Sequence, residues 1–185
     1  MYRLVIMGVS GSGKSTVARA LAERQGVGMI DGDELHLPAS IAKMKAGIPL
    51  QDDDRWPWLD RVGAELANAP AGLIVACSAL RKSYRDRIRV RAGRLRFIFL
   101  EGGFDLIHQR MSHRADHFMK PDLLHSQFAT LERPGPDELD IIALDIDRPI
   151  DVIVEEIIEA LPWPGQDDSI RATGEAPPAA GILQP

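Results

Sequence analysis

Short apolar runs alternate with segments of helical periodicity along most of the chain. The runs of strand length cover residues 4–7, 28–31, 73–77, 95–100 and 141–144. Continuous apolar runs are typical of parallel strands that helices cover on both faces. The clearest helical segment follows the last run, and its apolar stripe consists of Ile150, Ile153, Val154, Ile157, Ile158 and Leu161. The alternation predicts an α/β fold, a three-layer, doubly wound parallel sheet of about five strands.

Two segments depart from this alternation. Residues 112–132 are rich in histidine and arginine, and they are a candidate helical lid that closes over bound phosphates. From residue 162 onward, proline, glycine, alanine and aspartate dominate and the periodicity ends. We therefore expect a single domain over residues 1–161 and a flexible tail without chemistry over residues 162–185.

Composition narrows the class of protein. The chain has 185 residues, of which 45% are hydrophobic and 26% charged, and this suits one globular domain. A net charge of −5 argues against a general affinity for nucleic acids or anionic membranes. The single cysteine, Cys77, lies in an apolar run, which favours a buried thiol in a reducing compartment. No apolar run has the length of a signal peptide or a membrane span, so we expect a soluble cytoplasmic protein.

The first apolar run leads directly into a glycine-rich loop. Residues 8–15 read Gly-Val-Ser-Gly-Ser-Gly-Lys-Ser, the phosphate-binding pattern of a glycine, four residues and Gly-Lys-Ser. A strand before the loop and a helix after it are the setting in which this motif binds nucleotides. The glycines let backbone N–H groups turn toward phosphate oxygens, and the helix adds the positive end of its dipole. The expected nucleotide-binding residues of this segment are Gly8, Ser10, Gly11, Ser12, Gly13, Lys14, Ser15 and Thr16.

Candidate catalytic and metal-binding residues lie in this loop and after the second apolar run. Lys14 is expected to reach the outer phosphates of ATP, and the Ser15 hydroxyl to bind Mg²⁺. Asp31 and Asp33 are one residue apart at the end of a strand, so both reach the same crevice. We assign Asp31 to Mg²⁺, through water, and Asp33 to the attacking hydroxyl. An ordinary acidic turn is the alternative interpretation of this pair.

Four arginines are candidates for binding anions. Arg55 follows three acidic residues, 52–54, which also favour the start of a helix. Arg81 follows the third apolar run, and a guanidinium can hold a carboxylate through two parallel hydrogen bonds. Arg110 and Arg114 lie at or within the candidate lid, where arginines suit phosphate groups and the charge of a transferring phosphoryl group.

Other classes of function fit these residues less well. The third run ends in Cys77 and Ser78, where many nucleotide hydrolases keep a metal-binding aspartate, so a small-molecule kinase is favoured over a motor or switch ATPase. Residues 81–96 include eight basic side chains, but the acidic net charge favours a solvated face over a nucleic-acid site. His113 and His117 have the spacing of two metal ligands on a helix, yet no cysteine or third ligand accompanies them.

Taken together, these segments resemble the gluconate kinases of the small phosphate-loop type, over residues 3–161. Besides the loop, the matching segments are Asp-Gly-Asp-Glu-Leu-His at 31–36, Lys-Met at 43–44, Gly-Ile-Pro-Leu at 47–50, Asp-Asp-Asp-Arg-Trp-Pro-Trp-Leu at 52–59, Ser-Ala-Leu-Arg at 78–81, Tyr-Arg-Asp at 84–86, His-Phe-Met at 117–119, Leu-Leu at 123–124, Ser-Gln-Phe at 126–128 and Leu-Glu at 131–132. The segments at 52–59 and 126–128 are much narrower signals than the loop, which many nucleotide-binding families share.

The resemblance implies a P-loop kinase fold and transfer of the ATP γ-phosphoryl group to the 6-hydroxyl of D-gluconate. It also implies Mg²⁺, usually a homodimer, and kinship with shikimate kinase and the nucleoside monophosphate kinases. Lys14, Asp33 and Arg114 would then be catalytic, with Arg114 approaching the phosphates from the lid. The residues expected to bind the sugar acid are Asp33, His36, Lys43, Arg55, Arg81, His117 and Gln127.

The chain departs from the family pattern at three places. Ser40 stands where asparagine is common, and Leu37 separates His36 from the proline that usually follows it. The lid reads Arg-Ala-Asp-His at 114–117, where Lys-Gly commonly precedes the histidine. These departures concern the sugar contacts and the charge of the lid, and they leave the phosphate-binding residues unchanged.

Two alternatives to a gluconate kinase remain open from the sequence. One is a kinase for another small acceptor, such as shikimate or a nucleoside monophosphate. The other is a nucleotide-sensing or regulatory domain without turnover. The Asp31 and Asp33 pair and the basic lid favour catalysis, because a sensor needs no acceptor pocket.

Overall fold

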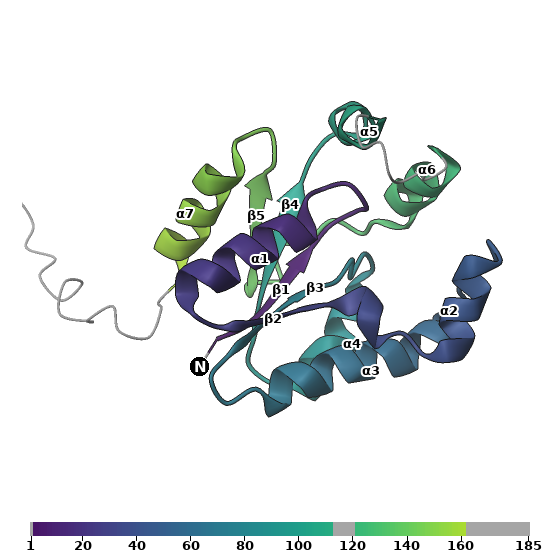
Figure 1. The fold of residues 1–185 in the computed structure, drawn as a ribbon, viewed down its shortest axis with the longest axis horizontal. Helices are drawn as coiled ribbons and strands as arrows, with labels where there is room; N and C mark the ends of the chain where they lie inside the picture. Colours follow the sequence, from purple (N-terminus) through teal and green to yellow (C-terminus); the bar gives the residue numbers. More distant parts are fainter. Residues whose placement is uncertain (1, 113–120, 162–185) are drawn as a thin grey trace, which may run out of the picture.

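The computed structural model describes residues 2–112 and 121–161, and these form a parallel five-stranded sheet between two layers of helices (Figure 1). The strands are β1 (Arg3–Met7), β2 (Gly28–Asp31), β3 (Leu73–Ala76), β4 (Arg96–Glu101) and β5 (Ile141–Asp145). Their order across the sheet is β2-β3-β1-β4-β5, and every neighbouring pair is parallel. The predicted fold class is confirmed, and each apolar run of strand length lies on a strand.

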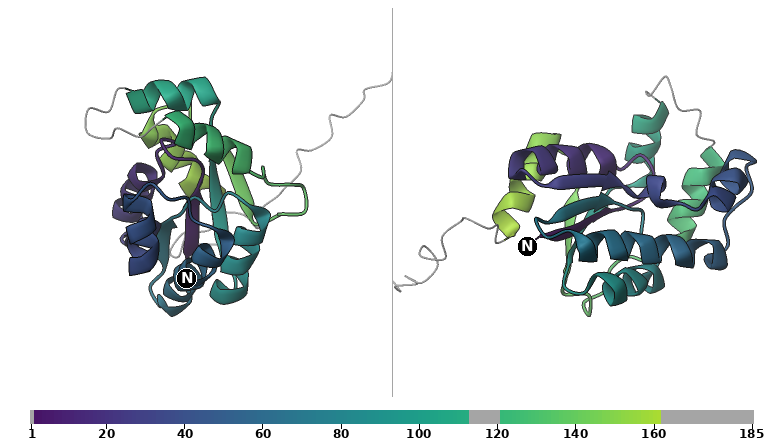
Figure 2. Two further views of the ribbon diagram at one scale, coloured as in Figure 1. Left: turned by 90° about the vertical axis from the view of Figure 1, so that its right-hand side faces the viewer. Right: turned by 60° about the horizontal axis from the view of Figure 1, so that its bottom comes forward.

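Helices cover both faces of the sheet because the strands bury side chains on both sides. Helices α1 (Lys14–Gln25) and α7 (Ile150–Ala160) pack on one face, and α3 (Asp52–Asn68) and α4 (Lys82–Ala92) on the other (Figure 2). Within β1, Leu4 and Ile6 join the core under α1 and α7, while Val5 and Met7 join the core under α3 and α4. This alternation is the two-residue period of a strand.

The remaining helices extend beyond the carboxyl ends of the strands. They are α2 (Pro38–Lys45), α5 (Phe104–Ser112) and α6 (Pro121–Thr130) (Figure 1). Helix α5 ends at Ser112, where the predicted lid begins, and α6 lies within the predicted lid. The residues between these two helices, like the predicted tail, lie outside the described residues. Ligands of doubly wound folds bind at this edge of the sheet. Within the described ranges, no helix is long and apolar enough to cross a membrane.

The connection after β2 brings the aspartates of the second run to this edge. A short 3₁₀ turn, Gly32–Leu35, follows β2, and the indole Nε1 of Trp58 on α3 donates a hydrogen bond to the carbonyl of Gly32 at 2.6 Å. A Cβ at Gly32 would lie 2.7 Å from the carbonyl oxygen of Ala76. Only glycine therefore lets β2 and β3 end so close together.

Helix α3 begins with the acidic run, as expected. Gln51 is its N-cap, and the backbone N–H of Gln51 donates to Oδ2 of Asp54 at 2.9 Å, which forms a capping box. Pro57 lies inside the helix, beyond its first turn. It has no N–H to donate to the carbonyl of Asp53, so this part of the helix lacks one backbone hydrogen bond.

Candidate active site

The loop between β1 and α1 has the backbone conformation that its glycines predict. Gly8, Gly11 and Gly13 have φ angles of 141°, 81° and 95°, which residues with a Cβ rarely adopt. Helix α1 begins at Lys14, directly after Gly13, so its N-terminus faces the loop. The strand–loop–helix arrangement that the phosphate-binding motif requires is therefore present.

The two residues expected to bind Mg²⁺ lie in direct contact. Ser15 Oγ donates a hydrogen bond to Oδ2 of Asp31 at 2.6 Å. The other oxygen of Asp31, Oδ1, accepts a hydrogen bond from the backbone N–H of Asp33 at 3.1 Å. A hydroxyl beside a carboxylate suits Mg²⁺, which in such proteins combines one or two side-chain oxygens with phosphates and water. No group of three acidic, histidine or cysteine side chains that could hold a metal occurs among the described residues.

Lys14 and Gln127 both contact the phosphate-binding loop. Lys14 Nζ donates a hydrogen bond to the carbonyl of Val9 at 2.9 Å. Gln127, on α6, accepts from the backbone N–H of Ser10 at 2.6 Å and donates to Ser10 Oγ at 3.1 Å. The structure thus places Gln127 on the loop, although the sequence suggested a sugar contact. That sugar contact stays a prediction.

Of the two arginines expected to bind phosphate, Arg110 is among the residues that the structure describes and Arg114 is not. Arg110, in the last turn of α5, donates from Nη2 to the carbonyl of Ile146 at 2.7 Å. Its guanidinium therefore contacts the segment that follows β5. Arg114 and His117 lie outside the described residues.

A cavity of about 490 Å³ brings together the two arginines expected to bind a carboxylate. Arg55 comes from α3 and Arg81 from the end of the connection between β3 and α4. The cavity walls come from the segment before α3, the first turn of α3, Arg81 and α6, and they consist of Pro49, Leu50, Gln51, Asp52, Asp53, Arg55, Arg81, Ser126 and Thr130. A polar cavity with two guanidinium groups suits a small anionic acceptor.

Asp52 lies between these two arginines. Its Oδ2 accepts a hydrogen bond from Arg81 Nη1 at 2.8 Å, and its Oδ1 accepts from the Tyr84 hydroxyl at 2.6 Å and from Arg55 Nη1 at 3.3 Å. Arg55 Nη1 also donates to the Tyr84 hydroxyl at 3.2 Å. The Tyr84 hydrogen bond and the nearby Arg81 and Arg55 lower the pKa of Asp52, and they outweigh the effect of partial burial.

His36 and Lys43 have other partners in this structure. The His36 ring is buried and stacks on Trp58 with ring centroids 4.3 Å apart. Burial lowers the pKa of His36, although Asp33 acts in the opposite direction. Lys43 Nζ forms an ion pair with Asp54 Oδ1 at 2.6 Å. Neither residue lines the cavity, so their expected sugar contacts stay predictions.

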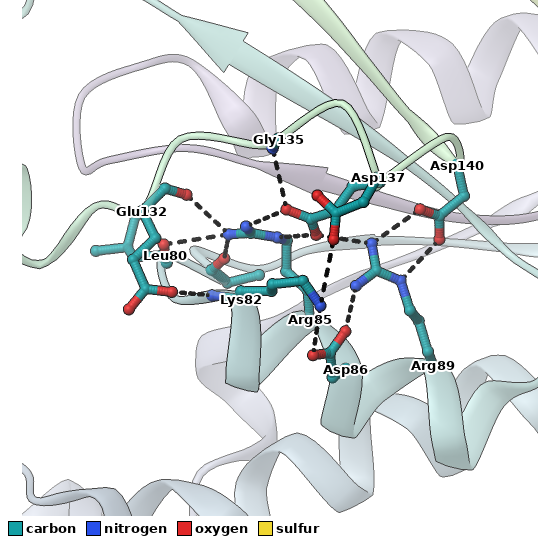
Figure 3. A network of polar contacts seen from close by, with 11 residues as sticks. Leu80, Lys82, Arg85, Asp86, Arg89, Glu132, Gly135, Asp137 and Asp140 are labelled. Carbon is teal, nitrogen blue, oxygen red and sulfur yellow. Dashed lines mark hydrogen bonds and ion pairs between the residues drawn. The ribbon is translucent and has the colours of Figure 1, made fainter.

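A second cluster of charges lies along α4 (Figure 3). Arg85 is fully buried, and its Nε and Nη2 donate to the two carboxylate oxygens of Glu138 at 2.7 and 2.6 Å. Its Nη1 donates to the carbonyls of Ala79, Leu80 and Glu132, at 3.2, 3.2 and 3.1 Å. The sequence suggested a solvated face with arginines directed at an anion, and for Arg85 this interpretation is wrong.

This cluster fixes the backbone that carries Arg81. Ala79 has a φ of 44°, in the left-handed region that residues with a Cβ avoid, and Arg85 holds its carbonyl. The carboxylate of Glu132 accepts a hydrogen bond from the backbone N–H of Lys82 at 2.7 Å, while its own N–H donates to Leu80 at 2.9 Å (Figure 3). The end of α6 and the start of α4 are therefore joined beside the cavity.

Ionisation of Glu138 is favoured in this cluster despite its burial. Removal from water disfavours the carboxylate, but hydrogen bonds from Arg85 and Arg89 outweigh that cost and lower the pKa of Glu138 to about 2. Arg89 also pairs with Asp140 at 2.8 Å and with Asp86 at 2.6 Å (Figure 3). None of these charged residues lines the cavity, so the role of the network is structural.

Sequence analysis missed three features of the site. It treated Asp52 as a residue that starts a helix and did not assign it a partner. It gave Tyr84 no role of its own, and it did not place Gln127 on the loop. Apart from the contact between Asp52 and Arg55, the hydrogen bonds that define these features join positions 29 to 117 residues apart. At such separations, periodicity and motif spacing give no signal.

Comparison with known proteins gives consistent results. A family model described as an AAA domain matches residues 4–133. The thermoresistant gluconokinase of Escherichia coli is 47% identical over 161 residues, which cover 85% of this chain and 91% of that protein. The gluconokinase of Gluconobacter oxydans is 43% identical, and the match covers 84% of this chain and 88% of that protein.

Solved structures resemble this one to different degrees. A gluconokinase from Sinorhizobium meliloti has a TM-score of 0.78 and 48% sequence identity, and the match covers 85% of this chain and 90% of that one. A shikimate kinase from Aquifex aeolicus has a TM-score of 0.55 at 16% identity, and this match, which covers 85% of this chain and 94% of that one, shows a shared fold.

Proposed function

The chain belongs to the gluconokinase family, and we propose that it transfers the γ-phosphoryl group of ATP to the 6-hydroxyl of D-gluconate. The products are 6-phospho-D-gluconate and ADP, so the protein is an ATP-dependent sugar-acid kinase. The observation that carries this conclusion is 47% identity to a gluconokinase over 85% of the chain. The cavity with Arg55 and Arg81 supports it, because a sugar acid needs a site for its carboxylate.

The phosphate-binding loop and the N-terminus of α1 would bind the phosphates of ATP. This assignment covers Gly8 and Ser10 to Thr16, with Lys14 at the outer phosphates, and it adds Arg110 on α5 and Arg114 from the lid. Ser15 and Asp31 would hold Mg²⁺, Asp31 through water, and the contact between their oxygens supports this pairing. When bound, Mg²⁺ neutralises the charge of the phosphates.

At the acceptor end, Asp33 would hold the 6-hydroxyl of gluconate. The hydroxyl oxygen forms a bond to the γ-phosphorus, the bond from that phosphorus to the leaving oxygen of ADP breaks, and the hydroxyl proton passes to the Asp33 carboxylate. Arg55 and Arg81 would bind the substrate carboxylate, and the remaining hydroxyls are assigned to His36, Lys43, His117 and Gln127. Positioning and charge stabilisation then provide most of the rate enhancement, and exclusion of water prevents hydrolysis.

The proposal extends to assembly and location. We expect a homodimer, as the family resemblance implies, located in the cytoplasm and without a nucleic-acid or membrane partner. The acidic net charge of −5 supports the absence of a nucleic-acid partner. Burial raises the pKa of the Cys77 thiol to about 12, which suits an inert thiol in a reducing compartment. Light scattering of the purified protein in solution would determine the oligomeric state.

A panel of acceptors tests the reaction. ADP release would be measured by a coupled assay with D-gluconate, shikimate, nucleoside monophosphates and no acceptor. We expect gluconate to give by far the highest kcat/KM and to raise ADP release well above the rate without an acceptor. A preference for shikimate or a nucleotide would overturn the substrate assignment. ATP binding without transfer to any acceptor would indicate a sensor domain instead.

A further inference from the structure

We propose that Asp52 sets the charge preference of the cavity. Because of Asp52, the cavity binds an acceptor with one negative charge, such as a carboxylate, better than one with two, such as a phosphate dianion. This inference rests on the proposed function and refines it, because it concerns discrimination between acceptors. The cavity contains two arginines, and without a counter-charge they would suit a phosphate dianion as well as a carboxylate. Asp52 supplies that counter-charge from inside the cavity wall.

The geometry places Asp52 on both arginines at once. Oδ2 lies 2.8 Å from Arg81 Nη1, and Oδ1 lies 3.3 Å from Arg55 Nη1. The Tyr84 hydroxyl donates to the same Oδ1 at 2.6 Å, and both guanidinium carbons lie 5.6 Å from the centre of the Tyr84 ring. Asp52 therefore accepts three hydrogen bonds, and all three favour its ionised form.

The charge balance of the cavity follows from its lining residues. Arg55 and Arg81 contribute two positive charges, and Asp52 removes one of them. Asp53 also lines the cavity, but it is exposed to water, and both guanidinium groups pair with Asp52 and not with Asp53. The other lining residues are uncharged. At the two guanidinium groups, one positive charge therefore remains uncompensated, and this matches the single carboxylate of a sugar acid. A phosphate dianion at the same position would have one negative charge without a partner.

The position of Asp52 is not explained by helix capping. Asp54 forms the capping box of α3 with Gln51, and Asp53 and Asp54 already place acidic side chains in the first turn. Asp52 instead turns toward Arg81 and Tyr84, which lie 29 and 32 residues away in sequence. Its contacts thus belong to the cavity and not to the helix end.

The test compares gluconate with an inhibitor that carries a different charge at carbon 1. D-Glucitol 1-phosphate has the stereocentres and the 6-hydroxyl of D-gluconate, but its carbon 1 is a CH₂ group that bears a phosphate ester instead of a carboxylate carbon. For each variant, the inhibition constant of D-glucitol 1-phosphate is divided by the KM of gluconate. We expect Asp52→Asn, which keeps the shape and removes the charge, to lower this ratio about tenfold.

Two further variants separate charge from other effects. Asp60→Asn removes the same charge from the same helix outside the cavity, where Asp60 pairs with Arg87 and Arg91, and it should leave the ratio within about twofold. Tyr84→Phe removes a hydrogen bond to Asp52 but keeps its charge, so the ratio should also change little. Thermal melting would verify that each variant is folded.

The outcomes are distinct. An unchanged ratio in Asp52→Asn, an equal change in Asp60→Asn or Tyr84→Phe, or no inhibition by the phosphate in either wild type or Asp52→Asn would overturn the role of Asp52. None of these results affects the proposed reaction. If the wild-type protein did not phosphorylate gluconate at all, the proposed function itself would fail.

Discussion

Two arginine–carboxylate clusters lie within one turn of each other at the start of α4, and they differ in exposure to water. In the first, Arg85 and Glu138 have side-chain exposures of 0% and 3%, and every polar group of the guanidinium has a partner. In the second, Arg81 and Asp52 are 39% and 40% exposed and border a cavity. The buried pair of Arg85 and Glu138 holds the backbone in place, whereas the exposed guanidinium of Arg81 is accessible to a ligand in the cavity.

Residue type and spacing alone therefore do not decide the role of an arginine. Arg81 and Arg85 are separated by one helical turn, and in sequence they are equally good anion-binding candidates. What separates them is the segment 132–140, which covers Arg85 with Glu138 and with the carbonyl of Glu132. Arg81 is not covered by this segment, and its guanidinium faces the cavity.

The largest expected effect is on stability. Arg85→Met leaves Glu138 buried without its main partner, and it should lower the free energy of unfolding by about 3–5 kcal/mol. Urea unfolding followed by circular dichroism would measure this change. Arg87→Met is the matched control on α4, because its pair with Asp60 is partly exposed and worth about 1 kcal/mol or less. Equal losses in the two variants would contradict the structural role of Arg85.

The second expected effect is a loss of stability in acid. The pKa of Glu138 is about 2 in the folded protein, below its ordinary value of 4.5. Its ionised form therefore stabilises the fold fully above about pH 4.5, and this contribution disappears as the pH falls from 4.5 toward 2. The measurement is the free energy of unfolding against pH for the wild type and for Glu138→Gln. If their difference stayed constant between pH 5 and about 2.5, the pair would not have the expected coupling.

The third prediction concerns the open cluster. Arg81→Gln should raise the KM for gluconate by about 10- to 100-fold, because the substrate carboxylate loses a charged double donor. The KM for ATP and the melting temperature should change little. Arg81→Lys keeps the charge but not the planar fork, so its KM should be intermediate. A large loss of stability with an unchanged KM would show that Arg81 acts like Arg85.

The smallest expected effect is at Gln127. Gln127→Ala removes two hydrogen bonds to Ser10 that hold the phosphate-binding loop, and water can replace part of what each contributes. Because the nucleotide must then order the loop itself, kcat/KM for ATP should fall by a few-fold. The same change at the exposed Gln109 on α5 is the control. Steady-state kinetics with varied ATP would detect the difference, and equal values for both variants would exclude a role for Gln127 in the loop.

Local patterns in the sequence predicted most of the fold. Continuous apolar runs identified all five strands, and the Gly8 to Ser15 motif identified the loop, because both signals depend on residues close together in the chain. The sequence also assigned Ser15 and Asp31 to one Mg²⁺, from a strand end at the edge where ligands bind, but it did not predict their direct hydrogen bond.

The charged clusters could not be predicted in the same way. Arg85 and Glu138 are 53 residues apart, and Gln127 and Ser10 are 117 apart, so their pairing depends on how the sheet and the segment after α6 pack. The acidic run at 52–54 correctly predicted the start of a helix, but it did not predict that Asp52 contacts two arginines. Nothing in the sequence distinguishes the three aspartates from one another.

The hydrogen bonds of Glu132 limit how α6 can move. The carboxylate and the backbone N–H of this residue attach the chain directly after α6 to Lys82 and Leu80, and Arg85 holds its carbonyl. A helix that is attached at its end moves least near that end, so any swing of α6 would displace the backbone of Pro121 more than that of Thr130. The hydrogen bonds between Gln127 and Ser10 resist such a swing, and they would have to break before this wall of the cavity could turn outward.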